Sequence, residues 1–154
     1  MAIYFLDTSA IVKRYIAEPG QAWVLSLCDP AQQHDLYILQ ITLVEVVATI
    51  CRRARAQSIS LPERDRLVAA FRQDSRTSYN LWPVSPEMFE AAGDLCLSHR
   101  LRAYDAVQLA CALALREYAL LNQAPLPILV CADRGLLDVA GGEGLQIENP
   151  NNYP

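Results

Sequence analysis

Four acidic residues lie at the ends of apolar segments or interrupt them, and their side chains could form a common site. Asp7 ends a short apolar run, and Asp133 follows a second one. Glu45 interrupts a β-branched segment, and Asp105 opens an apolar helical pattern. Carboxylates brought together repel one another, and a charge buried without a partner costs on the order of several kcal/mol. A divalent cation offsets that cost, so these residues predict a metal site.

The predicted elements explain how residues so far apart in the sequence can meet. Strands are predicted at residues 2–6, 36–39, 81–84, 128–131 and 145–147. Helices are predicted at residues 9–17, 21–28, 41–57, 62–76, 86–99, 105–121 and 134–140. This alternation predicts an α/β fold with a mostly parallel sheet between helices. Ligands bind such sheets at the carboxyl ends of the strands, and all four acids map to that edge.

Two of these predicted elements need a separate argument. The segment 41–57 is β-branched in its first half, but it is too long for a strand and ends in several arginines, which favours a helix. Pro83 cannot donate a hydrogen bond to a neighbouring strand, so the strand at 81–84 is expected at a sheet edge. Gly141 and Gly142 predict a turn before the last strand.

Length and charge limit the functions to consider. The chain has 154 residues, of which 53% are hydrophobic and 19% charged, so one globular domain spanning residues 1–154 is expected. The net charge of −4 argues against a broad basic surface for nucleic acid. All but one of the 13 basic residues are arginine, which binds phosphate well. Any contact with a polynucleotide is therefore expected to be small and centred on metal.

Cysteine usage and hydropathy favour the cytoplasm. The five cysteines are odd in number and lie in apolar stretches, which predicts reduced core residues: Cys28, Cys51, Cys96, Cys111 and Cys131. His34 and His99 have no partner at zinc-ligand spacing, and no C-x-x-C pair occurs. The sequence contains no signal-peptide pattern and no stretch long enough to span a membrane.

Four segments, at residues 5–13, 44–45, 101–110 and 132–137, match a known family. They resemble the PIN domain of VapC-type toxins, and the resemblance continues to Asn149 and Pro150. The resemblance implies a three-layer α/β/α sandwich with a five-stranded sheet ordered 3-2-1-4-5. It also implies a homodimer and a magnesium- or manganese-dependent endoribonuclease that acts as the toxin of a toxin–antitoxin pair, inhibited by its cognate antitoxin.

By this resemblance, Asp7, Glu45, Asp105 and Asp133 form the family's acidic quartet, and Ser9 is the hydroxyl residue beside the first acid. We expect Asp7 and Asp105 to hold Mg²⁺ or Mn²⁺. Asp133 is expected to hold a second ion or, like Glu45, to orient the attacking water. In-line attack on the phosphodiester would leave a 5′-phosphate, a polarity that comes from the resemblance.

Substrate and partner contacts are also predicted. Lys13, Arg102 and Arg134 lie close in sequence to the acids and, with Ser9, are expected to contact RNA phosphates. Single-stranded RNA or an unpaired loop is the expected target, because its backbone can enter a narrow cleft. The antitoxin is expected to cover an apolar groove bordered by the helices at 41–57 and 62–76.

Two residues depart from the family pattern. Cys131 stands where many relatives carry threonine or serine, and a thiol is a poor ligand for a hard metal ion. Tyr104 precedes Asp105 where a small residue is common, and its phenol would bind a substrate phosphate or cover the helix.

Other interpretations remain open. Asp105 would also suit a helix N-terminus, and Asp133 or Ser9 would also suit a helix cap. A metal-dependent phosphatase of the haloacid dehalogenase type needs a second aspartate two residues after Asp7, where Ser9 stands. A receiver domain needs a late lysine, but Lys13 is the only lysine. A PIN fold that binds RNA or protein without cleavage is the remaining alternative.

Overall fold

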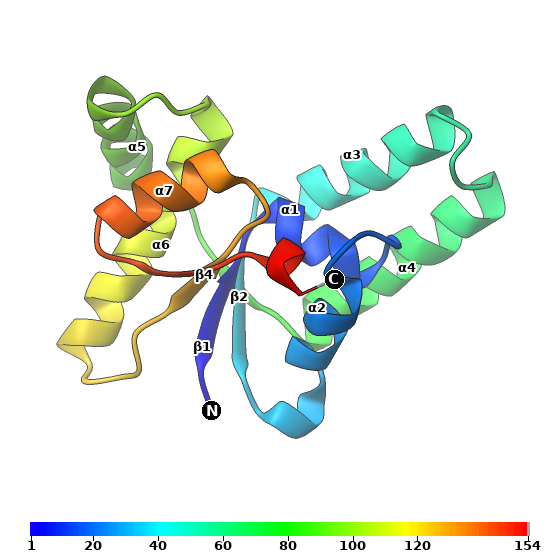
Figure 1. Cartoon of the computed structure of the whole chain (residues 1–154), viewed down its shortest axis with the longest axis horizontal. Coiled ribbons are helices and arrows are strands. Elements are labelled where there is room, and N and C mark those ends of the chain that lie inside the picture. The colour runs from blue at the N-terminus through cyan, green and yellow to red at the C-terminus, as the bar shows by residue number, and fades with distance from the viewer. Residues whose placement is uncertain (154) are drawn as a thin grey trace.

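A computed structural model of the chain describes residues 1–153, and a parallel sheet forms its centre (Figure 1). The strands are β1 Ile3–Leu6, β2 Asp35–Leu39, β3 Asn80–Trp82, β4 Ile128–Val130 and β5 Gln146–Glu148. Their order is β3-β2-β1-β4-β5, and every neighbouring pair is parallel. The expected order is therefore confirmed, and the carboxyl ends of all five strands lie at one edge.

Helices cover both faces of this sheet. The described helices are α1 Thr8–Ile11, α2 Gln21–Leu27, α3 Thr42–Arg55, α4 Leu61–Thr77, α5 Pro86–Ser98, α6 Ala103–Leu121 and α7 Arg134–Gly142. Short 3-10 turns occur at η1 Val12–Arg14, η2 Pro30–Gln32 and η3 Pro150–Asn152. In Figure 1, α5, α6 and α7 lie on one side of the strands and α1 to α4 on the other, which confirms the three-layer α/β/α sandwich. Within residues 1–153, no helix is both long and apolar enough to cross a membrane.

The two faces of the sheet carry two separate cores. Along β1, Phe5 packs into the cluster under α5, α6 and α7, whereas Leu6 packs into the cluster under α1 to α4. In β2, Ile38 packs into the cluster under α1 to α4, and Leu39 packs into the cluster under α5, α6 and α7. Successive side chains of a strand point to opposite faces. A strand covered on both sides must therefore be apolar throughout, which is why β1 appears in the sequence as an unbroken apolar run.

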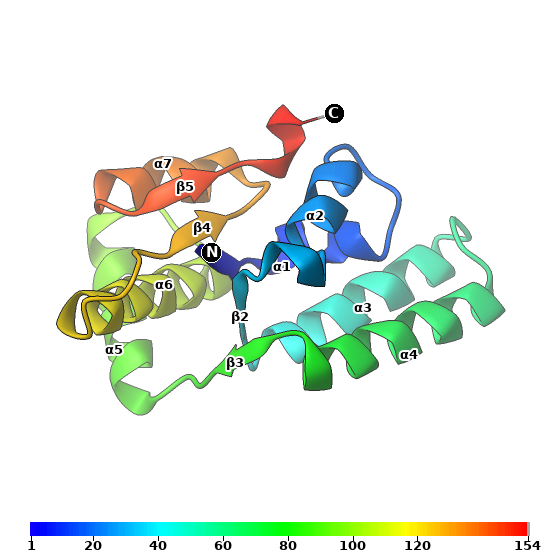
Figure 2. The ribbon, with the colours of Figure 1, turned by 90° about the horizontal axis from the view of Figure 1, so that it is seen from below.

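Helices α3 and α4 form an antiparallel pair that extends away from the sheet, and both views show them side by side (Figures 1 and 2). The Oγ of Ser60 accepts a hydrogen bond from the backbone N of Glu63 at 3.2 Å, which caps the start of α4. The pair is a local structure, because only residues 56–60 separate the two helices.

Most predicted boundaries shift by one or two residues in the structure, and three differences concern the local geometry. The helix expected at 9–17 is only one turn of α-helix followed by η1. Gly141 and Gly142 are the last residues of α7, and the chain turns instead at Gly144, whose φ is +85°. Positive φ favours glycine, so the third glycine of the segment makes the turn. Strand β3 ends at Trp82, so Pro83 follows the strand, although β3 does lie at the sheet edge.

The cysteines match the prediction in part. All five are free, and Cys28, Cys111 and Cys131 are buried. Cys51 is half-buried and Cys96 is exposed, so these two are not core residues. Cys96 lies on the outer face of α5, which packs against α6 along its other side.

Candidate active site

The four predicted acids line one cavity of about 530 Å³ at the carboxyl edge of the sheet, here termed the acidic cleft. Asp7 directly follows β1, and Asp133 lies three residues after the end of β4. Glu45 and Asp105 lie in the first turns of α3 and α6. The other lining residues are Thr8, Ser9, Val12, Lys13, Glu18, Thr49, Arg52, Arg102, Tyr104, Gln108, Ala132 and Asn151.

Asp7 is held by a hydroxyl group that also joins two strand ends. Asp7 is only 7% exposed, and its Oδ2 accepts hydrogen bonds from the backbone N of Ser9 at 3.0 Å and from Ser9 Oγ at 2.6 Å. Ser9 Oγ in turn accepts from the backbone N of Ala132 at 2.9 Å. This hydroxyl therefore fixes the carboxylate of Asp7 and ties the end of β1 to the segment after β4.

The buried thiol of Cys131 lies between the first and last acids. Its Sγ is 3.5 Å from Asp7 Oδ2 and accepts a hydrogen bond from the backbone N of Asp133 at 3.2 Å. Burial, followed by the negative charge of Asp7, raises the pKa of this thiol. The thiol therefore stays protonated at neutral pH and can donate a weak hydrogen bond to Asp7.

The acids influence one another electrostatically. Burial raises the pKa of Glu45, a hydrogen bond from the Thr8 hydroxyl opposes that rise, and the charges of Asp7 and Asp105 add to it. The pKa of Asp105 is raised by burial, then by the charges of Asp7 and Asp133. The four carboxylates line one cleft, so their negative charges repel one another.

Asp133 also caps a helix. Its Oδ1 accepts a hydrogen bond from the backbone N of Leu136 at 3.1 Å, at the start of α7. The capping interpretation of this residue is therefore correct. Because Asp133 lines the acidic cleft as well, the cap fixes its position there instead of removing it from the site.

The predicted cations are placed differently. Lys13 lines the cleft but is 3% exposed, and its Nζ pairs with Glu18 at 3.2 Å. The other carboxylate oxygen of Glu18 accepts a hydrogen bond from Arg53. Arg102 lines the cleft and is exposed. Arg134 does not line it and instead borders a separate cavity beside β5.

The donor set suits a hard divalent cation. Carboxylate oxygens are the ligands that Mg²⁺ and Mn²⁺ prefer, and the repulsion felt by Glu45 and Asp105 is what a cation would relieve. Among residues 1–153, no three His, Cys, Asp or Glu side chains are gathered into a ready-made metal cage. Mg²⁺ usually keeps several water ligands and binds one or two protein carboxylates, so acids spread around a cleft suit its coordination.

The sequence did not lead us to predict several of the residues that line the cleft. Gln108 is 1% exposed, and its Nε2 donates to Thr42 Oγ1 at 3.3 Å. It follows Asp105 by three residues, which places both on one helix face, so this spacing was a usable signal. Thr8 was detectable as a polar neighbour of Asp7. Glu18 and Asn151 had no local signal.

Comparison with protein families gives one match: the model of the PIN domain covers residues 4–140. No curated protein sequence matches the chain significantly.

Solved structures are similar in fold over almost the whole chain. VapBC2 from Rickettsia felis, solved bound to a promoter DNA fragment, has a TM-score of 0.59 at 16% identity and covers 96% of this chain and 98% of its own. A toxin–antitoxin complex from Klebsiella pneumoniae has a TM-score of 0.59 at 17% identity, covering 96% and 97%. PAE2754 from Pyrobaculum aerophilum has a TM-score of 0.63 at 19% identity, covering 98% and 85%. At these identities the likeness concerns the fold.

Proposed function

Because the chain belongs to the PIN domain family, we propose that it is a metal-dependent endoribonuclease. The observation that supports this most is the single solvent-accessible cleft lined by Asp7, Glu45, Asp105 and Asp133. We propose single-stranded RNA or an unpaired RNA loop as the substrate, since its backbone is free to enter a cleft of about 530 Å³.

Each acid has a proposed role in phosphodiester hydrolysis. Asp7, Asp105 and Asp133 would hold Mg²⁺ or Mn²⁺. A bound ion would lower the pKa of a coordinated water and offset charge that develops at phosphorus. Ser9 keeps Asp7 in position through its 2.6 Å hydrogen bond. Glu45 accepts a hydrogen bond from the Thr8 hydroxyl, and in this proposal it would orient the attacking water and accept its proton, a role that its raised pKa supports.

Positive charge at the cleft would contact the RNA backbone. Arg102 is exposed, so its guanidinium can reach a phosphate at the cleft mouth. Lys13 is buried and paired with Glu18, so a contact between its ammonium and a phosphate would require this ion pair to open. Arg134 lies outside, and a contact with RNA there would involve nucleotides that leave the cleft.

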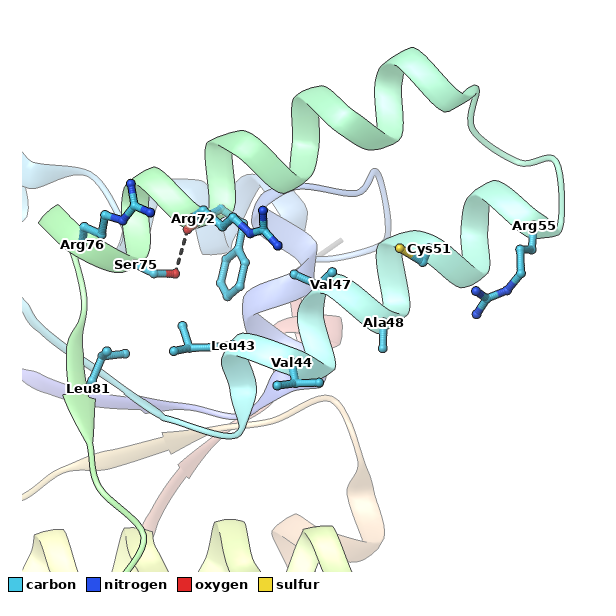
Figure 3. Close-up of a pocket in the computed structure, with 11 residues that line it drawn as sticks. Leu43, Val44, Val47, Ala48, Cys51, Arg55, Arg72, Ser75, Arg76 and Leu81 are labelled. Carbon is cyan, nitrogen blue, oxygen red and sulfur yellow. Dashed lines mark hydrogen bonds between the residues drawn. The ribbon is translucent and has the colours of Figure 1, made fainter.

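We also propose that the protein acts as a toxin in the cytoplasm and is inhibited by a cognate antitoxin. Supporting evidence is an apolar groove of about 670 Å³ between α3 and α4, at the predicted location (Figure 3). Its apolar lining comes from α3, α4 and β3: Leu43, Val44, Val47, Ala48, Cys51, Phe71 and Leu81. Such a groove suits the apolar face of a helix.

Charge at the groove favours an acidic partner. Arg55, Arg72 and Arg76 line it, and none of them forms an ion pair with any residue between 1 and 153. Unpaired cations beside an apolar surface complement an amphipathic helix that carries glutamate or aspartate. We propose an antitoxin segment of that kind as the occupant.

The nuclease proposal is tested by Asp7→Asn. We expect cleavage of a fluorescent single-stranded RNA in Mg²⁺ or Mn²⁺ to fall at least about 1000-fold, because a central carboxylate charge is lost. Asp138→Asn, an exposed aspartate of α7 outside the cleft, is the matched control. Thermal unfolding checks that both variants fold. An Asp7→Asn protein that cuts RNA as fast as the parent would refute the proposal.

The toxin proposal is tested by co-expression with the product of the neighbouring small reading frame. We expect growth arrest by the protein alone, relief on co-expression, and a stable complex on size-exclusion chromatography. The same experiment reports the mass of the free protein, which checks the homodimer that the family resemblance implies. Neither complex nor relief would contradict the toxin assignment.

A further inference from the structure

The C-terminal turn η3 contributes a side chain to the acidic cleft. Asn151 lines the cleft, whereas the next residue, Asn152, lines the separate cavity beside β5. The turn η3 lies next to α2, and it is far in the sequence from Asp7, Glu45 and Asp105 (Figures 1 and 2). The turn therefore presents two neighbouring asparagines to two different spaces.

Several contacts hold this turn in place. Gly20 has a φ of +85°, and a Cβ there would lie 2.2 Å from the backbone oxygen of Pro150, so the two backbones touch as only glycine allows. The rings of Trp23 and Tyr153 stack with centroids 4.7 Å apart and planes 4° apart. The backbone N of Asn151 donates to Asn149 Oδ1 at 2.9 Å. The backbone of Asn151 is thus fixed before any substrate arrives.

The side chain of Asn151 is exposed and makes no hydrogen bond to any residue from 1 to 153. Its amide carries both donors and an acceptor, as the edges of unpaired bases do. It is also neutral, so it does not repel phosphate. These properties suit a residue that forms hydrogen bonds with a base, while the acids take part in hydrolysis of the phosphodiester.

We propose that Asn151 contacts the edge of an unpaired base of the RNA and that η3 is a specificity-determining wall of the cleft. This inference rests on the proposed nuclease function. A preformed wall selects bases at little entropic cost, because the backbone that carries the amide is already ordered. Trp23 acts as a positioning residue through its stack on Tyr153.

The test measures cleavage of single-stranded RNAs randomised around the cut site, by the full chain in Mn²⁺. For Asn151→Ala we expect weaker base preference and a KM about 3- to 10-fold higher on the best substrate, with kcat nearly unchanged. Asn152→Ala should keep the parent's preference and KM. Trp23→Ala should broaden the preference in the same direction as Asn151→Ala, with thermal unfolding used to check that it folds.

The possible results distinguish a failure of this inference from a failure of the nuclease proposal. If the parent cleaves RNA and Asn151→Ala retains its base preference and KM, the inference is wrong and the nuclease proposal stands. An Asn152→Ala variant that loses preference as much as Asn151→Ala also overturns the inference. If the parent does not cleave RNA in Mg²⁺ or Mn²⁺, both proposals are overturned together.

Discussion

The acidic cleft and the apolar groove are built in opposite ways. Residues of the cleft come from strand ends and helix starts between Asp7 and Asn151, so they meet only when the whole sheet has formed. Residues of the groove come from Leu43 to Leu81, mainly from two helices joined by a short loop. The cleft depends on the order of the strands, and the groove depends on the pairing of neighbouring helices. Long-range topology thus positions the charges, and local amphipathicity forms the apolar surface.

Their charges also differ. The acids of the cleft repel one another, and its buried lysine is matched by Glu18. The arginines of the groove are unmatched by any acid within residues 1–153. This difference agrees with the proposed occupants, a cation in the cleft and an acidic chain in the groove. Three substitutions test whether the cleft and the groove act independently of each other.

The largest effect is expected from Val44→Asp in the groove. Val44 is 67% exposed, so the substitution should barely change the stability of the free protein. A carboxylate buried against an apolar partner surface costs more than about 3 kcal/mol, so antitoxin affinity should fall at least about 100-fold by calorimetry. Val44→Leu, which keeps the apolar surface, is the control. Loss of RNA cleavage by free Val44→Asp protein would show that the regions are not independent.

A smaller effect is expected from Glu18→Gln, which removes the charge that balances Lys13. A buried ammonium left with only an amide partner should lower the free energy of unfolding by about 1–3 kcal/mol, measured with urea. Glu117→Gln removes the exposed partner of Arg116 and should cost less than about 1 kcal/mol. Equal losses in the two variants would mean that Lys13 does not depend on Glu18.

The smallest change in stability is a gain expected from Glu45→Gln. Because the folded state raises the pKa of Glu45, its ionised form disfavours folding, and parent stability from this group declines as pH rises through the folded pKa. The variant should therefore gain up to about 1 kcal/mol at pH 7, limited by solvent screening, and lose RNA cleavage. At a pH below the unfolded pKa the gain should vanish, since the parent carboxyl is then protonated. A loss of stability in Glu45→Gln at pH 7 would contradict this expectation.

The sequence was sufficient where one local rule decided the outcome. An apolar run followed by an acid located β1 and Asp7, because a strand covered on both faces has no other composition. The sheet order came from the family resemblance, since periodicity does not determine which strands pair. The turn at Gly144 was assigned two residues early because three glycines lay close together and only tertiary packing selects among them.

Proximity in sequence was a poor guide to proximity at the cleft. Arg134 is adjacent to Asp133 but begins α7, and neighbouring residues of a helix point in different directions. Asn151 is 18 residues further along the chain, yet it reaches the cleft because Gly20 lets the C-terminal turn approach closely. A single sequence cannot reveal that approach, because it depends on how a loop before α2 meets the end of the chain.

Helix α3 is a wall shared by both regions, since Glu45, Thr49 and Arg52 face the cleft while Val44, Val47 and Ala48 face the groove. Consecutive codons in this helix would therefore serve the two proposed ligands. Under that proposal, replacements at positions 44, 47 and 48 would change which inhibitor is recognised and leave the acids of the cleft in place. A duplicated gene would then acquire a new inhibitor by altering one side of a single helix.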